Sequence, residues 1–166
     1  MRTNNKQKYN LTLHILHPAP AGVLLKVKRG ELALDNNFKK GNFGEMSTDV
    51  ELAQKGYKPL HSRITDITKA PSKGIDGVFE KDGQYFIVES KFKGWARLSK
   101  DAADGPQMSD AWINGSDRIL NAVGEENRKL IQTNGYKRVL SEVSPEGKII
   151  YKGIDALGNP LNQINL

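Results

Sequence analysis

Asp76, Glu89 and Lys91 place two carboxylates and an ammonium group within a short stretch of the chain. Carboxylate oxygens are the ligands that Mg²⁺ and other hard divalent cations prefer. A cation held in this way can polarise a phosphate group and lower the pKa of a bound water, while a nearby lysine stabilises the negative charge that develops. These residue types therefore predict metal-dependent hydrolysis of a phosphodiester bond.

A predicted β-hairpin must bring the two acids together. Residues 75–80 and 85–92 have the composition of strands, and Asp82-Gly83 between them is a strong signal for a two-residue turn, because both central positions need a positive φ. In that register Asp76 lies opposite Glu89, with Cβ atoms ~4.5–5.5 Å apart. The hairpin therefore predicts that the two carboxylates face each other.

Side chains alternate between the two faces of a strand, so the second strand presents two sets of residues. One face carries Tyr85, Ile87, Glu89 and Lys91, and the other carries Phe86, Val88, Ser90 and Phe92. Directly opposed carboxylates repel each other and destabilise a mainly apolar hairpin. A bound divalent cation would offset that repulsion.

The alternative is that Asp76 and Glu89 are charges at the rim of an edge hairpin, with Lys91 as their salt-bridge partner. Two observations besides the register favour a site. Glu89 follows an apolar run that is typical of a buried strand, and Gly74 and Gly77 flank Asp76, where a phosphate backbone could come close or where a turn needs them.

Helical periodicity is predicted before and after the hairpin. Phe43, Met46, Val50 and Ala53 recur at three- and four-residue steps, which predicts an amphipathic helix of roughly three turns that ends at Lys55-Gly56. Gly105-Pro106 predicts the start of a second helix, because proline suits the first helical position. That helix would carry Gln107, Met108, Trp112 and Ile113.

The rest of the chain completes a mixed architecture. Gly115-Ser116 interrupts the second helix, residues 117–123 continue its apolar pattern, and a last helix over about 125–133 ends at Asn134-Gly135. Residues 136–143 and 148–155 are predicted strands, residues 18–22 a turn or linker, and residues 23–27 a short strand. The order of elements predicts an α/β (α+β) fold with a mixed β-sheet flanked by helices.

Length and charge predict one domain preceded by a basic segment. The 166 residues suit a single core, and the net charge is +6. Residues 1–41 hold eight basic and two acidic residues, while the remaining chain is balanced. We expect residues 1–40 to be a partly ordered lead-in or linker, which either binds polyanions or is only solvated, and residues 41–166 to be the functional domain.

Composition excludes several classes of protein. There is no cysteine, which rules out disulfides, thiolate zinc sites and a cysteine nucleophile. No apolar run approaches the ~20 residues that a membrane span needs, so we expect no membrane-spanning segment. A glycine-rich nucleotide-binding loop is also absent.

At these positions the sequence resembles the PD-(D/E)XK nuclease superfamily. Glu45 corresponds to the acid of its first helix, Gly74-Ile75-Asp76-Gly77 to its second acidic position, and Ile87-Val88-Glu89-Ser90-Lys91 to its catalytic strand. The proline of the superfamily's name is replaced by Ile75. The resemblance implies a restriction-endonuclease-like sheet and a catalytic set of Glu45, Asp76, Glu89, Lys91 and Gln107. It also implies that Glu45, Asp76, Glu89 and the backbone carbonyl of Ser90 hold one or two divalent ions, Mg²⁺ first and Mn²⁺ or Zn²⁺ as alternatives.

The sequence is similar to one branch in particular, the C-terminal nuclease toxin domains of bacterial polymorphic and contact-dependent inhibition toxins. The similar segments are Lys73–Phe79, Val88–Lys91 and Gly105–Trp112, and the resemblance covers about residues 41–123. It implies a toxin that is secreted or delivered from the cell surface as part of a larger protein and acts in the cytoplasm of a target bacterium. It further implies DNA as the first candidate substrate and a cognate immunity protein as partner.

The segment that follows the catalytic strand is rich in basic residues. Lys93, Arg97 and Lys100 follow Lys91 with no acid among them, and Trp95 lies between them. A basic loop that leaves the active strand suits a nucleic-acid backbone, although it could equally be a solvated loop. We expect Trp112 in the core and His61 to be an ordinary surface histidine.

Two other functions fit the same residues. One is an RNase toxin on the same fold, including a tRNA-cleaving one. The other is a basic module that binds nucleic acid without chemistry, in which case binding would be salt-sensitive and independent of Glu89.

Overall fold

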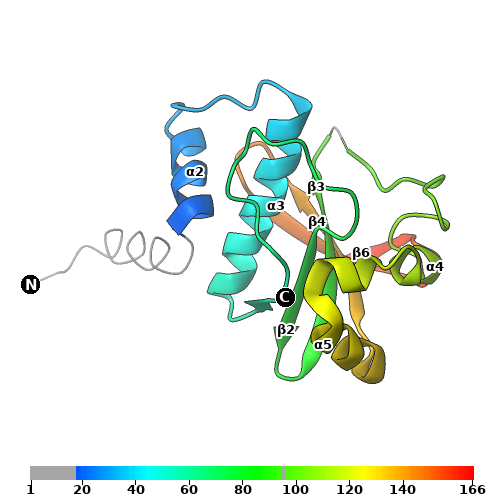
Figure 1. The fold of residues 1–166 in the computed structure, drawn as a ribbon. Helices are drawn as coiled ribbons and strands as arrows, with labels where there is room; N and C mark the ends of the chain where they lie inside the picture. Colours follow the sequence, from blue (N-terminus) through cyan, green and yellow to red (C-terminus); the bar gives the residue numbers. More distant parts are fainter. Residues whose placement is uncertain (1–17, 95) are drawn as a thin grey trace, which may run out of the picture.

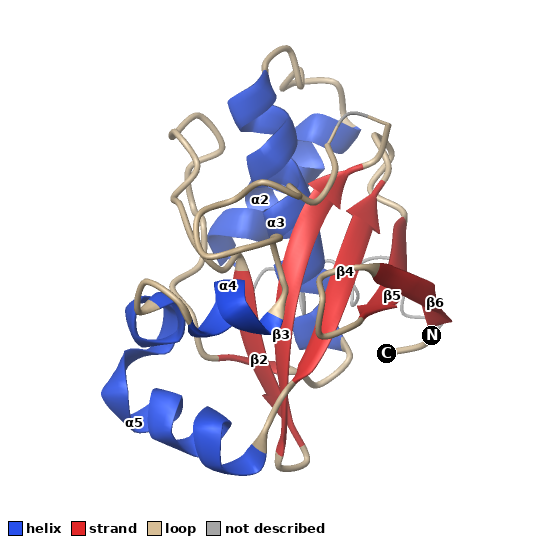
Figure 2. Ribbon diagram, turned by 90° about the vertical axis from the view of Figure 1, so that its right-hand side faces the viewer, coloured by secondary structure: helices blue, strands red, loops and turns tan. Residues whose placement is uncertain are grey.

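The computed structural model describes residues 18–94 and 96–166, and in these residues one six-stranded sheet carries helices on both faces (Figures 1 and 2). The strands lie in the order β1-β2-β3-β4-β5-β6; β3 and β4 are parallel, and the other neighbouring pairs are antiparallel. The elements are α2 (Pro18–Lys28), α3 (Asn37–Gln54), β1 (Lys58–Pro59), β2 (Gly77–Lys81), β3 (Gln84–Phe92), α4 (Asp110–Asn114), α5 (Arg118–Asn134), β4 (Lys137–Val143), β5 (Ile149–Ile154) and β6 (Pro160–Ile164). The predicted α/β class with a mixed sheet is confirmed.

The β2–β3 hairpin has the predicted register. Lys81 pairs with Gln84 and Val78 with Ile87, around a turn in which Asp82 has φ 51° and Gly83 has φ 76°. Both central residues are therefore left-handed, as a turn of this length requires. β2 begins at Gly77, so Asp76 lies just before the strand and not within it.

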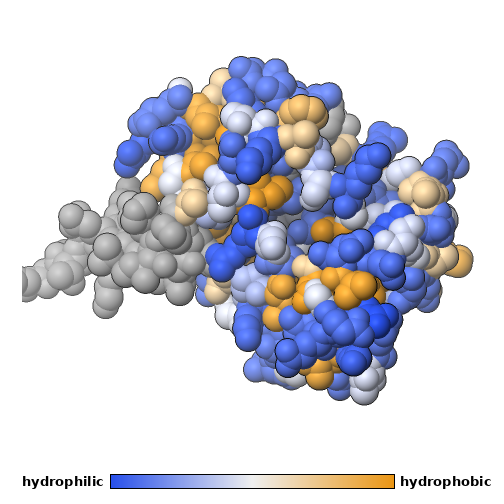
Figure 3. Space-filling model, in the orientation of Figure 1, coloured by the Kyte–Doolittle hydropathy of each residue, from blue (hydrophilic) through white to orange (hydrophobic). Residues whose placement is uncertain are grey.

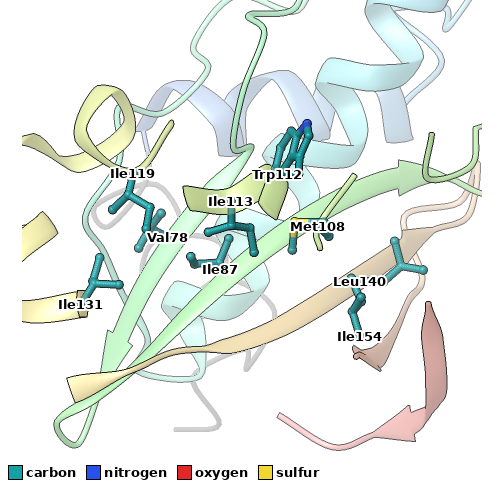
Figure 4. Close-up of a cluster of buried hydrophobic side chains, with 9 residues drawn as sticks. All are labelled: Val78, Ile87, Met108, Trp112, Ile113, Ile119, Ile131, Leu140 and Ile154. Carbon is teal, nitrogen blue, oxygen red and sulfur yellow. The ribbon is translucent and has the colours of Figure 1, made fainter. Parts of the chain in front are cut away.

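The two faces of the sheet are buried by different helices. α3 packs on the face that carries Phe86 and Val88, whereas α4 and α5 cover the face that carries Ile87 (Figure 2). Figure 4 shows the second cluster, which consists of Val78, Ile87, Met108, Trp112, Ile113, Ile119, Ile131, Leu140 and Ile154. The predicted alternation along β3 is confirmed, and so is the placement of Trp112 in the core, where it is buried.

The predicted turn at 18–22 and the strand at 23–27 are wrong, because both segments belong to α2. Pro18 and Pro20 lie in the first turn of that helix, where the missing N–H of proline has no intrahelical partner to lose. Val23, Leu24 and Val27 then fall on one side of the helix and pack against the cluster around Phe43 and Met46 of α3. Helical spacing of these apolar residues therefore outweighs their β propensity.

The predicted helix start at Gly105-Pro106 is also wrong. Gly105 has φ 115° and Met108 has φ 68°, and neither conformation continues a helix. α4 begins at Asp110, where the Ser109 side chain caps the helix by accepting a hydrogen bond from the Trp112 N–H. Gln107 consequently lies on a loop and not on a helix.

The later predictions agree better with the structure. α5 runs from Arg118 to Asn134 with a non-helical residue at Gly124, so the two predicted helices form one kinked element. It ends at Gly135, which has φ 76°. β4 and β5 match the predicted strands, while the short β1 and the edge strand β6 were not predicted.

The described helices are all too short or too polar to cross a membrane, as expected. In the view of Figure 3, hydrophilic side chains cover most of the surface, and apolar residues gather over α5 and beside α2.

α3 begins at Asn37, after the cap residue Asn36, and α2 packs against it. The division of the chain at residues 40 and 41 stays a prediction.

Candidate active site

Asp76 lies next to β3 through a hydrogen bond to the backbone. The Ser90 N–H donates to Asp76 Oδ2 at 2.9 Å, which holds this carboxyl beside Glu89. The two carboxyls lie close enough that the negative charge of Asp76 adds to burial in raising the pKa of Glu89. The hairpin thus brings together the two acids that its register predicted to meet, although Asp76 is outside the strand.

Glu89 is the most enclosed acid of the group, with 2% of its surface exposed. Its Oε1 atom accepts a hydrogen bond from Gln107 Nε2 at 2.6 Å and forms an ion pair with Lys91 Nζ at 2.7 Å. Its Oε2 atom is buried and has no hydrogen-bond partner among the described residues. A buried carboxylate oxygen without a hydrogen-bond partner has lone pairs that are free to coordinate a cation.

Glu45 reaches the same place from α3. Its carboxyl lies close enough to feel the charges of Glu89 and Lys91, and its own charge raises the pKa of Asp76. α3 comes close to β3 at Gly44, where an added Cβ would lie 3.8 Å from the Phe92 nitrogen. The sheet therefore receives its third acid from a helix that packs directly on the strand of Glu89.

Hydroxyl groups fix α3 on the sheet behind the acids. Thr48 Oγ1 lies 2.7 Å from Ser141 Oγ and accepts a hydrogen bond from Ser90 Oγ at 3.0 Å. All three side chains are buried, so each hydroxyl depends on the others for its hydrogen bonds. The described contacts of Ser90 are thus to Asp76 and Thr48, and a role for its carbonyl as a metal ligand stays a prediction.

The surroundings of the three carboxyls oppose their ionisation. Burial raises the pKa of Glu45, Asp76 and Glu89 to about 8 each, and the mutual repulsion of the three charges raises it further. Burial alone would lower the pKa of Lys91, but the neighbouring Glu89 carboxylate outweighs it and the pKa is raised. An additional positive charge next to the three acids would favour their ionised form.

The donor set fits a hard divalent cation. Three carboxyls converge, burial and then their mutual repulsion raise their pKa values, and one buried Glu89 oxygen has no partner in the described residues. As positioned, no three acidic or histidine side chains in residues 18–94 and 96–166 are close enough together to ligate one metal ion. The Lys91 ammonium and the Gln107 amide instead occupy the other Glu89 oxygen.

The acids line an open depression with a volume of about 830 Å³. Lys91, His61, Gln107 and Arg118 line it together with the three acids. This volume lies within the range of ligand pockets, which is ~300–1,000 Å³. A segment of a polymer that enters the depression would therefore meet the carboxyls and the lysine together.

The prediction that His61 is an ordinary surface histidine is wrong. Its side chain is 4% exposed, Nε2 lies 2.9 Å from Asp49 Oδ1, and Nδ1 accepts a hydrogen bond from the Val78 N–H at 3.0 Å. Burial alone would lower its pKa, but the hydrogen bond to Asp49, the charge of Asp49 and the contact with the Val78 backbone together outweigh burial, and the pKa is raised. His61 thereby ties the start of β2 to α3, and no sequence spacing pointed to it.

Gly77 has a packing role that the sequence left open. A Cβ at Gly77 would lie 2.9 Å from Phe79 Cε2 and 3.4 Å from His61 Cε1. The glycine therefore makes room for these two rings and not for a phosphate group. Gly74 has φ 126°, which a residue with a side chain rarely adopts, and nothing lies within 4 Å of its would-be Cβ.

Gln107 connects the acids to the basic loop. Its Oε1 accepts a hydrogen bond from the Ser99 N–H at 3.1 Å, and its own N–H donates to the Ser99 carbonyl at 2.8 Å. The predicted nucleic-acid-binding residues Lys93, Arg97 and Lys100 are exposed on this loop. Trp95, which the sequence placed among them, lies outside the described residues.

Comparisons with protein-family models, with curated proteins and with solved structures gave no match to this chain.

Proposed function

We propose that this chain is a metal-dependent nuclease that hydrolyses phosphodiester bonds, with DNA as the first candidate substrate. One observation carries the proposal: Glu45, Asp76 and Glu89 meet Lys91 in a single open depression, and one buried oxygen of Glu89 has no partner among the described residues. A structural ion pair would need one acid for one lysine. Three acids around one lysine leave an excess of negative charge, which a divalent cation neutralises.

The residues have separate roles in this proposal. Glu45, Asp76 and Glu89 would hold the cation, Mg²⁺ first and Mn²⁺ or Zn²⁺ as alternatives. When bound, it supplies positive charge that polarises the phosphate and makes a nearby water more acidic. Lys91, whose ammonium lies 2.7 Å from Glu89, stays protonated and stabilises negative charge on the phosphate. Gln107 orients Glu89 through its 2.6 Å hydrogen bond.

A digestion experiment tests the proposal. Plasmid DNA and total RNA are incubated separately with the full chain in Mg²⁺, Mn²⁺, Zn²⁺ or chelator. We expect cleavage that requires a divalent ion and is lost in excess chelator. Cleavage of RNA alone would assign the RNase alternative, whereas cleavage that persists in chelator would end the metal-dependent mechanism.

Two variants test the assignment of residues. We expect Glu89→Ala and Lys91→Ala each to lower the cleavage rate by at least about a hundredfold, because each removes charge that acts at the scissile phosphate. Lys129→Ala, an exposed lysine on α5, is the matched control and should cleave like the wild type. Full activity in either site variant, with a folded circular-dichroism spectrum, would contradict the assignment. Salt-sensitive binding with no product at any metal concentration would indicate the non-catalytic module.

We further propose that the nuclease is a toxin domain, delivered to target bacteria as part of a larger protein and neutralised by a cognate immunity protein. The sequence resemblance supports this, and the site geometry is compatible with it. Expression of the chain should be toxic to a bacterial host, and Glu89→Ala should relieve the toxicity. Equal toxicity of the wild type and of this variant would overturn a nuclease as its cause.

A further inference from the structure

A second groove lies beside the acid cluster. It is lined by residues 93–94 and 96–100, which follow β3, and by residues 157–160 at the β5–β6 turn and the start of β6, and its volume is about 760 Å³. Lys91 and Ala96 line both this groove and the depression that holds the acids. A bound polymer that extends from the acid cluster past Lys91 therefore enters the groove directly.

One wall of the groove is basic. Lys93, Arg97 and Lys100 line it with exposed side chains, and none of them has an ion-pair partner in the part of the chain that the structure describes. Glu142 is the acidic residue among the described lining residues, and its carboxylate is engaged by Lys152 Nζ at 2.5 Å. The positive charge of this wall is thus uncompensated and open to a polyanion.

A second set of lining residues carries no charge and is called the uncharged wall. It consists of Leu157, Gly158, Asn159 and Pro160, and Leu157 is 71% exposed. Asp155 shapes the turn, since its Oδ1 accepts hydrogen bonds from the N–H groups of Leu157 and Asn159. An exposed apolar side chain that lines the same groove as three cations can contact the apolar part of a charged ligand.

We infer that this groove binds a single-stranded stretch of polynucleotide next to the bond that is cut; the inference rests on the nuclease function proposed above. A single strand presents phosphates along one edge and unpaired bases along the other, which matches one basic and one uncharged wall. A duplex presents phosphates on both outer edges and encloses its bases. A groove of this volume is also the size of a pocket for a small molecule, so it accommodates short lengths of one strand.

Gln107 holds the two walls and the acids in a fixed relation. It is bonded to Ser99 in the basic wall and to Glu89 in the acid cluster. A Cβ at Gly158 would lie only 2.7 Å from the Gln107 carbonyl oxygen, so the uncharged wall is seated against the same residue. Gln107 therefore fixes the position of a polynucleotide strand in the groove relative to Glu89.

Binding of short oligonucleotides to the full chain tests the inference. Fluorescein-labelled single-stranded DNA, single-stranded RNA and a blunt DNA duplex are titrated in chelator, which prevents cleavage, and fluorescence anisotropy gives the affinity. The variants are Leu157→Glu and the triple change Lys93→Ala, Arg97→Ala and Lys100→Ala. The controls are Leu161→Glu, an exposed leucine on β6, and the triple change Lys58→Ala, Lys129→Ala and Lys148→Ala, which removes the same charge elsewhere.

We expect the wild type to prefer a single strand to the duplex. The triple groove variant should lose roughly a hundredfold in affinity at about 0.1 M salt. The slope of log affinity against log salt concentration should become less negative by about two. Leu157→Glu should lose at least about tenfold, and both controls should bind more tightly than their groove counterparts. Comparison of the DNA and RNA strands identifies which nucleic acid the groove prefers.

The outcomes separate this inference from the nuclease proposal. Metal-dependent cleavage together with unchanged single-strand affinity in both groove variants would overturn the groove and leave the nuclease standing; an acidic protein partner would then fit the groove better. Groove-dependent binding of a single strand without any cleavage would support the groove and overturn the nuclease. A wild type that binds only the duplex, or no nucleic acid at all, would overturn the inference.

Discussion

Glu89 and Asp76 are held in a state that costs the folded protein stability. Glu89 is buried and Asp76 is half-buried beside it and Glu45, and the pKa of each is raised to about 8. A raised pKa on a buried acid means that the folded protein resists ionisation there. Residues selected only for stability would not be arranged in this way, and clusters of groups with perturbed pKa values are typical of functional sites.

Asp76→Asn separates the functional role from the structural one. Asparagine keeps an oxygen that can accept the hydrogen bond from the Ser90 N–H, while one negative charge is removed. We expect cleavage to fall by at least about a hundredfold. In chelator, the melting temperature of the variant should be close to that of the wild type near pH 4 and exceed it increasingly up to about pH 8, because only the wild type loses stability as the unfolded chain releases the Asp76 proton. A lower melting temperature at pH 9 would show that the Asp76 charge is stabilising.

The parts of the site that are local in sequence were predictable, and those that depend on the fold were not. Asp76 and Glu89 meet because a two-residue turn fixes the register of one hairpin. Glu45 was inferred from resemblance alone. The contact of Gln107 with Glu89 and that of His61 with Asp49 arise when separate elements pack together, and no periodicity encodes them.

At the scale of elements, the packing of α3 on β3 sets the position of Glu45. The helix approaches the strand at Gly44, and the buried hydroxyls of Thr48, Ser90 and Ser141 join the two layers. Such a cluster specifies one rotation of the helix, because any other would leave hydroxyl groups buried without partners. The sequence pattern predicted this helix but could not predict the depth at which it packs.

Two glycine substitutions test how closely these elements pack. An alanine side chain at Gly44 would have its nearest neighbour at 3.8 Å, which is ordinary contact, so Gly44→Ala should stabilise the protein by about 0.5–1 kcal/mol through helix propensity. At Gly77 the same methyl group would lie 2.9 Å from the buried Phe79 ring, so Gly77→Ala should destabilise by about 1–3 kcal/mol. Urea unfolding followed by circular dichroism measures both; destabilisation by Gly44→Ala would mean that α3 and β3 are closer than described.

At the scale of the whole molecule, the acid cluster makes stability depend on pH and on metal. The ordinary pKa values of the three acids are 3.8 to 4.5, whereas those in the folded protein are about 8. Between these values the folded protein binds protons that the unfolded chain has released, so the free energy of unfolding falls as the pH rises. The raised pKa of His61 acts in the same direction.

We therefore expect the melting temperature in chelator to decrease from pH 5 to pH 8 and to level off above it. A saturating divalent cation should raise the melting temperature most at the alkaline end, because it binds the ionised carboxyls of the folded protein. The double variant Asp76→Asn, Glu89→Gln should show a flatter pH dependence and a smaller response to the cation. A melting temperature that increases over this range in chelator would contradict the raised pKa values.

The parallel pairing of β3 with β4 divides the chain into two parts of different adaptability. Every acid of the cluster, together with Lys91, precedes the end of β3 at Phe92. The excursion from residue 93 to residue 136, which a parallel pair of strands requires, carries the basic wall, Gln107, α4 and α5. Changes in the length or composition of residues 93–136 can therefore alter which ligand the protein binds, while the acid cluster and Lys91 that carry the proposed chemistry stay unchanged.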